Sequence, residues 1–283
     1  MPASNKAEPS PEDFAKQFHA ENLTSSVYGP NNPPKDWADA SLLIPHETIR
    51  REMDSMQKSV RKLVSRVDDK SYQGWQAIYF CEWYVDIFEP FVRMHHDIEE
   101  EIFFPWLAEK ATLPTKKYGK SHEELLDMLK NIGVVCVAII NKKGKNCENY
   151  IRDLAMQADK LVPELRVHLQ EEEEEIPALE REHYTKADEE MVVKKIIARA
   201  PFSELREVFP AILEGISEWG TEAYRDDLLR QLPAPLRYLM LHYFVPDYES
   251  SIKPKRDAPF LDAKPTLTRK RCCGIFFCCA CII

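Results

Sequence analysis

Two stretches, HHDIEEEIFFPWL at residues 95–107 and HLQEEEEEIPAL at residues 168–179, decide the fold that we expect. In each, a histidine is followed four residues later by a glutamate, which gives the pairs His95–Glu99 and His168–Glu172. Residues spaced by four lie on one face of an α-helix, and here that face is otherwise apolar. Each stretch therefore predicts a helix that directs one imidazole and one carboxylate into the core.

Outward from these stretches, apolar residues recur at alternating spacings of three and four, the pattern of helices that pack in a bundle. The predicted helices cover residues 41–67, 73–111, 117–142 and 147–184. Ser41 is expected to cap the first helix, and Pro90 to kink the second. Glycine is scarce, with 8 residues against 20 prolines, which disfavours barrels, sandwiches and dinucleotide-binding folds. We therefore expect an all-α, up-down-up-down four-helix bundle.

The first and third predicted helices also carry a histidine on the apolar face, His46 and His122. Each of the four histidines lies about 21–24 residues from the turn that joins its helix to the next, or ~30–35 Å of helix. In an antiparallel bundle with short turns, the four imidazoles are therefore expected at one level. His96 and Glu100 are one position out of this register, so we expect them to contact the ligands from outside or to lie on the surface. Within Glu171–Glu175, all but Glu172 are expected to be mostly solvated.

Buried imidazoles and carboxylates without partners cost several kcal/mol, and a pair of divalent metal ions would satisfy them. Imidazole suits iron, zinc and copper, and a carboxylate can bridge two ions. The predicted metal ligands are His46, His95, Glu99, His122, His168 and Glu172. Haem held by two histidines is a weaker alternative because it needs no adjacent carboxylates. The other alternative is a set of purely structural histidines.

The two His–Glu stretches, together with His46 in PHETIRREM and His122 in SHEELLDML, resemble hemerythrin-like (HHE cation-binding) domains over residues 41–184. The resemblance implies a non-haem di-iron centre with two irons per chain, four terminal histidines, and Glu99 and Glu172 as bridging carboxylates. Oxygen-carrying hemerythrins have a fifth histidine where this chain has Leu126. The resemblance is therefore closer to hemerythrin-like sensors of iron and oxygen, with O2 or another diatomic or peroxide ligand as the partner.

The remaining chain divides by composition. Residues 1–40 form a polar, proline-rich N-terminal tail, residues 185–250 a helical extension, and residues 251–283 a basic, cysteine-rich tail. The extension is expected either to cover the core further or to act as a lid near the metal level. Because the net charge is −9, we do not expect the protein to bind nucleic acid.

The C-terminal tail ends in TRKRCCGIFFCCACII, which combines a basic run with five of the eight cysteines. The cysteines are Cys272, Cys273, Cys278, Cys279 and Cys281. The apolar segment at residues 274–283 is too short to span a bilayer. Prenylation requires a cysteine at the fourth position from the C-terminus, where this sequence has Ala280. Multiple S-palmitoylation next to basic residues would anchor a cytoplasmic protein to an anionic membrane surface. A zinc knuckle or an unmodified tail are the alternatives.

The sequence thus predicts a metal-binding protein that senses or handles oxygen or iron at a membrane surface. The first alternative is an enzyme at the same centre, a di-iron oxidase with ferroxidase-like or peroxidase-like activity. The second is a structural or zinc-binding adaptor tethered to the membrane.

Overall fold

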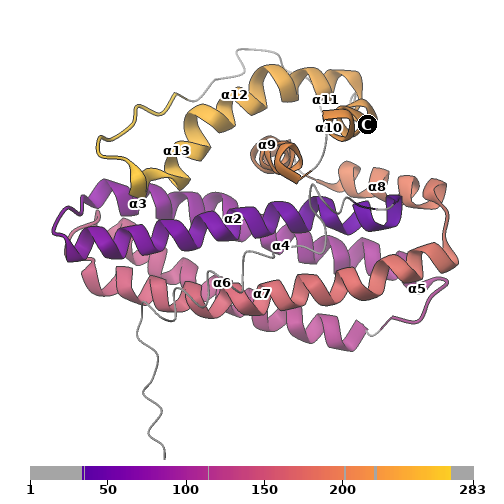
Figure 1. Cartoon of the computed structure of the whole chain (residues 1–283), viewed down its shortest axis with the longest axis horizontal. Helices are drawn as coiled ribbons and strands as arrows, with labels where there is room; N and C mark the ends of the chain where they lie inside the picture. The colour runs from indigo at the N-terminus through magenta and orange to yellow at the C-terminus, as the bar shows by residue number, and fades with distance from the viewer. Residues whose placement is uncertain (1–33, 35, 114, 201, 220–221, 269–283) are drawn as a thin grey trace, which may run out of the picture.

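The computed structural model describes residues 34, 36–113, 115–200, 202–219 and 222–268. Within these ranges the chain forms helices and their connections, and no strand, so the expected all-α class is confirmed. Figure 1 shows long helices lying side by side beneath a layer of shorter helices from the second half of the chain.

The lower layer, which we call the long-helix core, spans residues 37–183. It consists of α2 (Trp37–Asp68), α3 (Gly74–Trp83), η1 (Tyr84–Phe88), α4 (Glu89–Ile98), η2 (Glu99–Phe103), α5 (Phe104–Ala108), α6 (Thr115–Asn141) and α7 (Glu148–His183). The elements from α3 to α5 follow one another without a break in the helical run. Helix α2 packs against α7, α7 against α6, and α6 against α3.

Helix α2 begins four residues before the expected start. The carboxylate of Asp36 accepts hydrogen bonds from the backbone N–H groups of Ala38 and Asp39, which makes Asp36 the N-cap. An aspartate can cap a helix as well as a serine can, so the earlier residue takes this role. Ser41 is not the cap; its hydroxyl donates instead to the carboxylate of Glu180 on α7, at 2.8 Å.

Proline positions explain why the helices contain π turns. Each π turn is followed, at the second residue after its end, by a proline: Pro90 after η1, Pro105 after η2, Pro246 after η3 (Met240–Phe244) and Pro254 after η4 (Tyr248–Ile252). Proline lacks an N–H group, and its ring would clash with the carbonyl four residues earlier. A wider turn relieves this clash, and the N–H of Glu89 accordingly donates to the carbonyl of Tyr84, five residues earlier. At Pro90 the second long helix therefore continues through a π turn.

Two apolar clusters fill the long-helix core, and the predicted histidines lie between them. On each helix that carries one of these histidines, the residues on one side of it belong to the larger cluster, which includes Ile49, Val92, Leu125 and Leu165. The residues on the other side belong to a smaller cluster, which includes Leu42, Phe103, Tyr118 and Ile176. The level that contains these histidines therefore has an apolar cluster on each side of it along the helices.

The upper layer comes from the second half of the chain. It contains α8 (Lys186–Arg199), α9 (Phe202–Trp219), α10 (Glu222–Gln231), α11 (Ala234–Leu239), η3, α12 (Val245–Asp247), η4, α13 (Lys253–Arg256) and η5 (Ala258–Phe260). Helix α9 packs on α2, and Val208 and Ala211 of α9 join the larger apolar cluster of the core. A separate apolar cluster, with Phe209, Leu236 and Met240 among its members, holds the upper layer together.

The described part of the predicted C-terminal tail, residues 251–268, contacts α2 and α3. The guanidinium of Arg256 donates to Glu52 on α2 at 2.8 Å, and Arg66 of α2 donates to the carbonyl of Pro259 at 2.6 Å. Gln76 of α3 donates to the carbonyl of Leu261 at 2.8 Å. Residues 251–268 therefore belong to the packed protein. Composition does not reveal these contacts, because basic residues that pair with buried acids look the same in a sequence as basic residues in solvent.

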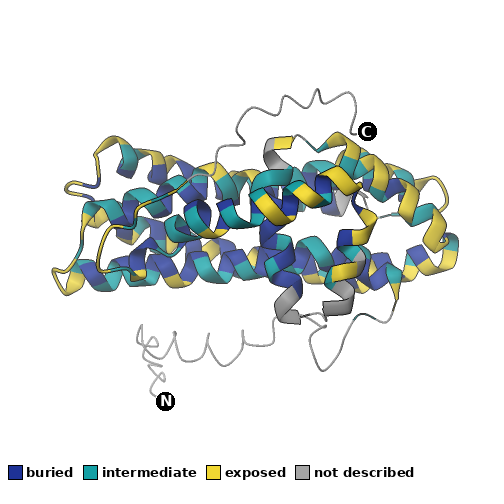
Figure 2. Cartoon of the chain, turned by 90° about the horizontal axis from the view of Figure 1, so that it is seen from above, coloured by how far each residue is buried: buried dark blue, intermediate teal, exposed yellow. Residues whose placement is uncertain are grey.

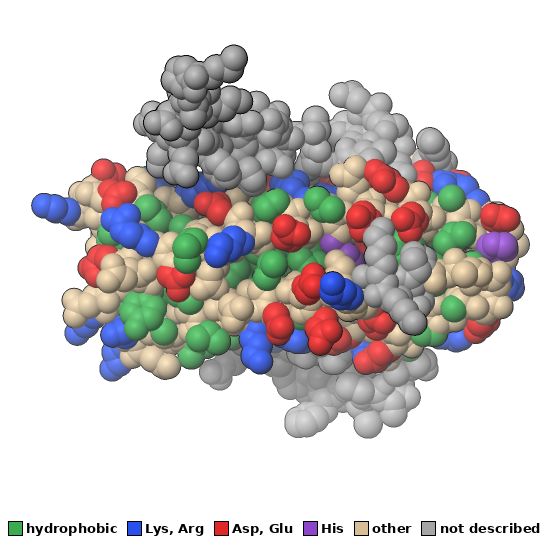
Figure 3. All heavy atoms as spheres, turned by 90° about the horizontal axis from the view of Figure 1, so that it is seen from below, with side chains coloured by type: hydrophobic (Ala, Val, Ile, Leu, Met, Phe, Trp, Pro, Cys, Tyr) green, Lys and Arg blue, Asp and Glu red, His purple; other side chains and the backbone are tan. Residues whose placement is uncertain are grey.

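The surface carries mostly polar side chains, together with scattered apolar ones such as Val134, Val167 and Met191. Figure 2 shows exposed positions at the turns and on the outer faces of the helices, with buried positions between them. On the opposite side of the molecule, Asp and Glu side chains lie among Lys and Arg side chains (Figure 3). None of the helices in the described ranges combines the length and apolarity needed to cross a bilayer.

Glu180 gives the protein a predicted pH dependence. Burial raises the pKa of this carboxyl group to about 8, despite its hydrogen bond from Ser41. The folded chain therefore holds a proton that the unfolded chain releases above its ordinary pKa, and the free energy of unfolding falls as the pH rises from about 5 to 8. Glu180→Gln, which carries no charge, should remove this decrease of up to about 1.4 kcal/mol per pH unit. Urea unfolding of the two proteins across this range measures the difference.

The matched control for this prediction is Glu182→Gln, an exposed carboxylate on the same helix. It should leave the pH profile of the wild type unchanged. If Glu180→Gln and the wild type lose stability in parallel between pH 5 and 8, Glu180 is not the group responsible.

Candidate metal centre

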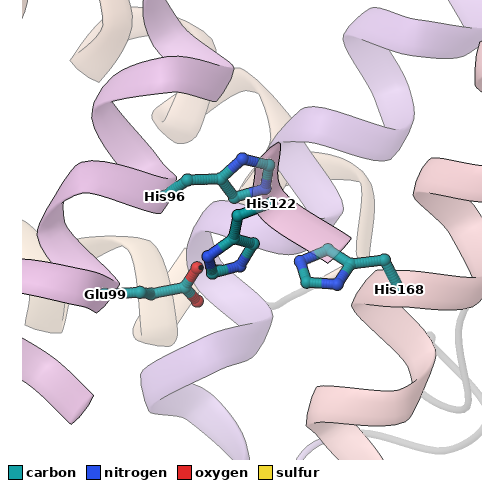
Figure 4. A group of neighbouring side chains, drawn as sticks. All are labelled: His96, Glu99, His122 and His168. Carbon is teal, nitrogen blue, oxygen red and sulfur yellow. Dashed lines mark ion pairs between the residues drawn. The ribbon is translucent and has the colours of Figure 1, made fainter. Parts of the chain in front are cut away.

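The structure brings all six predicted ligands together at one level of the long-helix core. His46 comes from α2, His95 from α4, Glu99 from the first position of the π turn η2, His122 from α6, and His168 and Glu172 from α7. Every one of these side chains is buried, with at most 5% of its surface exposed. Figure 4 shows Glu99, His122 and His168 of this group together with the neighbouring His96, with side chains from three different helical runs meeting in the interior.

The two carboxylates lie between the imidazoles. For Glu99, Oε1 is 3.7 Å from His46 Nε2 and 3.4 Å from His95 Nε2, and Oε2 is 3.6 Å from His122 Nε2. For Glu172, Oε2 is 3.6 Å from His46 Nε2, and Oε1 is 3.4 Å from Nε2 of both His122 and His168. Each carboxylate thus turns one oxygen toward one group of histidines and the other oxygen toward a second group.

This division defines two subsites. In the first, ligand atoms of His46, His95, Glu99 and Glu172 lie within 4.8 Å of one another. In the second, ligand atoms of His96, Glu99, His122 and His168 do so. We call them the two-histidine subsite and the three-histidine subsite. Two atoms that bind one ion at ~2.1 Å with a tetrahedral angle are about 3.4 Å apart, so the observed separations suit shared metal coordination.

His96 corrects the expectation that it lies outside the ligand group. Its side chain is 1% exposed, and its ring stacks on that of His122 with centroids 4.2 Å apart. Successive side chains on an α-helix are rotated by about 100°, so two neighbours can lie about 50° to either side of the inward direction. His95 consequently faces His46, while His96 faces His122 and His168. The adjacent histidines of the sequence were the signal for this fifth imidazole.

Hydrogen bonds outside the cluster orient three of the rings. His46 Nδ1 hydrogen-bonds with Glu173 at 2.9 Å, His122 Nδ1 with Glu100 at 2.8 Å, and His168 Nδ1 with the hydroxyl of Ser121 at 3.1 Å. Using Nδ1 in this way turns Nε2 toward the centre, the arrangement that commonly fixes histidine ligands of metals. Glu100 thus contacts a predicted ligand from outside, which is one of the two places expected for it.

Glu173 is a residue of the candidate site that sequence reasoning missed. It was expected to be solvated, but it is 5% exposed and accepts two hydrogen bonds from Arg50, at 2.7 and 3.0 Å. Burial raises the pKa of Glu173, but His46 and Arg50 outweigh burial and lower it to about 2. The available signal was Arg50 itself, which follows His46 by four residues and so lies on the same face of α2.

Burial and neighbouring charges shift the ionisation of the cluster. Burial, followed by the proximity of Glu172, raises the pKa of Glu99 to about 7. Burial and the surrounding imidazoles hold the pKa of His95 and of His96 well below the ordinary value, so both rings are neutral and keep a lone pair. Burial lowers the pKa of His46, but its hydrogen bond to Glu173 and the carboxylate of Glu99 outweigh burial and raise it to about 9.

The inward-facing atoms of this cluster have no hydrogen-bond partners among the described residues. This holds for both oxygens of Glu99, both oxygens of Glu172, both nitrogens of His96, and Nε2 of His46, His95 and His122. A buried polar group left in this way costs about 1–3 kcal/mol. So many such atoms converging on one level fit a cationic group that satisfies them together. Five imidazoles, two carboxylates and no thiolate suit borderline divalent ions such as iron or zinc.

Two sequence predictions fall elsewhere. The five tail cysteines lie outside the described residues. The extension forms a layer beside α2, and its helices α8 and α9 line a cavity that reaches His95 and Glu99.

No family model, curated protein or solved structure matches this chain. The metal assignment therefore depends on the donor atoms of the cluster and on the distances between them.

Proposed function

We propose that this protein holds two iron ions in a hemerythrin-like, up-down-up-down four-helix bundle and uses them to sense or handle oxygen or iron. The observation that carries the proposal is the placement of Glu99 and Glu172. Each turns one oxygen toward the two-histidine subsite and the other toward the histidines of the second subsite. A carboxylate that faces two ligand groups in this way is suited to bridge two ions.

The donor set favours iron over a structural zinc ion. Structural zinc sites use four ligands, commonly with cysteine, in a closed tetrahedron. Here the described cluster contains five imidazoles and two shared carboxylates, with no thiolate. His96 supplies the fifth imidazole that Leu126 does not, although it comes from a different helix. The resemblance of the His–Glu stretches to hemerythrin-like domains also favours iron.

The two subsites differ in the number of imidazoles they offer. Because Glu172 also turns an oxygen toward His122 and His168, four residues face the two-histidine subsite and five face the three-histidine subsite, so the former leaves more positions for an external ligand. We propose that O2, another diatomic molecule or peroxide binds there. Bound iron would supply the redox chemistry. The chain's own residues hold the carboxylates and imidazoles in place and exclude bulk water by burial.

Oxygen exposure of the iron-loaded full chain tests this function. Titration with Fe(II) under anaerobic conditions, followed by air, should give near-ultraviolet absorption that saturates at two iron ions per chain. Glu174→Gln, an exposed neighbour on α7, should behave as the wild type. Continued consumption of added Fe(II) or peroxide far beyond two equivalents would contradict a sensor and favour the oxidase alternative. Absence of any iron-dependent absorption would contradict both.

We further propose that the C-terminal tail anchors the protein to an anionic membrane surface through palmitoylated cysteines. Within the tail, Lys253 pairs with Glu214, Lys255 with Glu82, and Arg256 with Glu52, so these three charges serve internal contacts. The basic residues left closest to the cysteines are Arg269, Lys270 and Arg271. A short basic run next to several acyl chains is sufficient for stable attachment.

Replacing all five tail cysteines by serine should move the full-length protein from the membrane fraction to the soluble fraction of cells. The variant keeps the charge of the tail and every contact of residues 251–268, so its folding should be unchanged. Fractionation and metabolic labelling with a palmitate analogue measure the two effects. A variant that stays with the membrane and loses no label would contradict the proposal.

A further inference from the structure

A large apolar cavity lies between the long-helix core and the upper layer. Its volume is about 650 Å³, and its walls come from α2, α4, η2, α8, α9 and α10. Most of its surface is aliphatic or aromatic, with contributions from Leu42, Phe91, Val193, Ile197, Leu205 and Ile212. The cavity is partly open to solvent, so a molecule can enter it from outside. A cavity of this size is in the range of sites that bind small organic molecules.

The cavity meets the metal centre on one side only. His95 and Glu99 line it, whereas His96, His122 and His168 do not. His95 belongs to the two-histidine subsite, at which we place the external ligand of the proposed function. A molecule in the cavity would therefore reach the more open subsite, and the three-histidine subsite would stay behind it.

The lining determines the chemistry of the occupant. Apart from His95 and Glu99, the acidic and basic residues that line the cavity in the described part of the chain are Asp36, Lys186, Glu189 and Glu190. Lys186 already pairs with Glu190 at 3.8 Å, and burial raises the pKa of Glu189 to about 7. An anionic ligand would meet these acidic groups, and the one lysine among the described lining residues is already paired. A neutral molecule with a hydrocarbon body fits the aliphatic walls because its burial is driven by the hydrophobic effect.

We propose that this cavity is a binding site for a neutral, apolar organic molecule, such as a medium-chain alcohol, with one end against His95 and Glu99. The proposal rests on the proposed function for what lies at that end of the cavity. Binding itself depends on the apolar walls, so it is expected with and without metal. The extension is thus assigned a role in forming a ligand site, in addition to covering α2.

Fluorescence of 1-aminoanthracene, a neutral aromatic probe, tests the cavity in the full chain. The probe should bind once per chain, and alcohols from hexanol to dodecanol should displace it with increasing affinity. Ile197→Trp on α8 and Ile212→Trp on α9 fill the cavity from two walls, and each should weaken probe binding at least tenfold. Met156→Trp, at an exposed position on α7, is the matched control and should change binding less than twofold.

Circular dichroism and thermal unfolding of each variant identify any that fails to fold, and two walls provide two independent variants. The proposal is overturned if the wild type shows no saturable binding, or if both folded cavity variants bind the probe as the wild type does. Metal content, measured on the same samples, separates the two proposals. A protein that binds the probe but takes up no metal would contradict the di-iron function alone. A protein that takes up metal but does not bind the probe would contradict the ligand site alone.

In the metal-loaded wild type, saturation with dodecanol should also shift the near-ultraviolet absorption of the centre. Ile197→Trp should remove this shift while keeping the absorption itself. An unshifted spectrum at full occupancy of the probe site would contradict contact between the occupant and the end of the cavity at His95 and Glu99.

Discussion

Glu172→Leu is expected to stabilise the metal-free protein and to abolish the binding of two metal ions. Without metal, Glu172 is a fully buried carboxylate whose two oxygens have no hydrogen-bond partner among the described residues. It also lies near Glu99, whose pKa is raised to about 7 by burial and by this neighbour. A buried carboxyl group whose oxygens accept no hydrogen bond costs free energy, so an apolar side chain of similar volume in its place is expected to stabilise the metal-free protein by about 1–3 kcal/mol.

With metal, the order of stability should reverse. A ligand that binds only the folded state stabilises it by about 4 kcal/mol when its concentration is a thousand times its Kd. The wild type should gain this stabilisation, whereas Glu172→Leu should gain little because both subsites lose a shared carboxylate. Urea unfolding with a chelator and with anaerobic Fe(II) measures both effects. A structural role for Glu172 predicts the opposite in the metal-free protein, namely a loss of stability in Glu172→Leu but not in Glu174→Gln.

Arg256→Met should lower the free energy of unfolding by about 3–5 kcal/mol. Arg256 is 4% exposed, and its guanidinium donates to Glu52 and to the hydroxyl of Tyr248. Glu52 on α2 is also 4% exposed, so removal of the arginine leaves a buried carboxylate without its hydrogen-bonded guanidinium. Chemical denaturation of the full chain in one fixed metal state measures the loss.

Two further variants separate the buried pair from charge effects in general. Arg152→Met breaks the exposed pair with Asp68 and should cost less than about 1 kcal/mol, because surface ion pairs contribute little. Glu52→Leu combined with Arg256→Met should recover much of the stability lost by the single arginine variant. If Arg256→Met and Arg152→Met have equal small effects, residues 251–268 do not hold to α2 in the way described.

Much of the long-helix core could be predicted because its signals are local. The spacing of Leu42, His46 and Ile49 fixes one inward face, and short turns fix how far each histidine lies from its neighbours in space. The predicted ligands therefore meet at one level without any knowledge of long-range contacts. The π turns were not predicted, although each precedes a proline, because the same proline also permits a kink.

Whether His96 and Glu173 are buried depends on which face of each helix packs against its neighbours, and the sequence alone does not establish those faces. His96 is one position from His95, and only the packing of α4 against α6 decides that both imidazoles are buried. In the sequence, Glu173 is one member of an acidic run, and only the structure shows that Arg50 donates a hydrogen bond to it. The cavity and the packing of residues 251–268 arise from contacts between distant segments, and composition carries no information about those contacts.

Metal content of the full chain, purified without oxygen, tests the central claim most directly. Mass spectrometry should find two iron ions per folded wild-type chain and a loss of both in Glu172→Leu, with Glu174→Gln unchanged. A helical, cooperatively folded wild type that holds no metal after incubation with Fe(II), and whose stability does not respond to a chelator, would contradict the claim. The five buried histidines would then be structural.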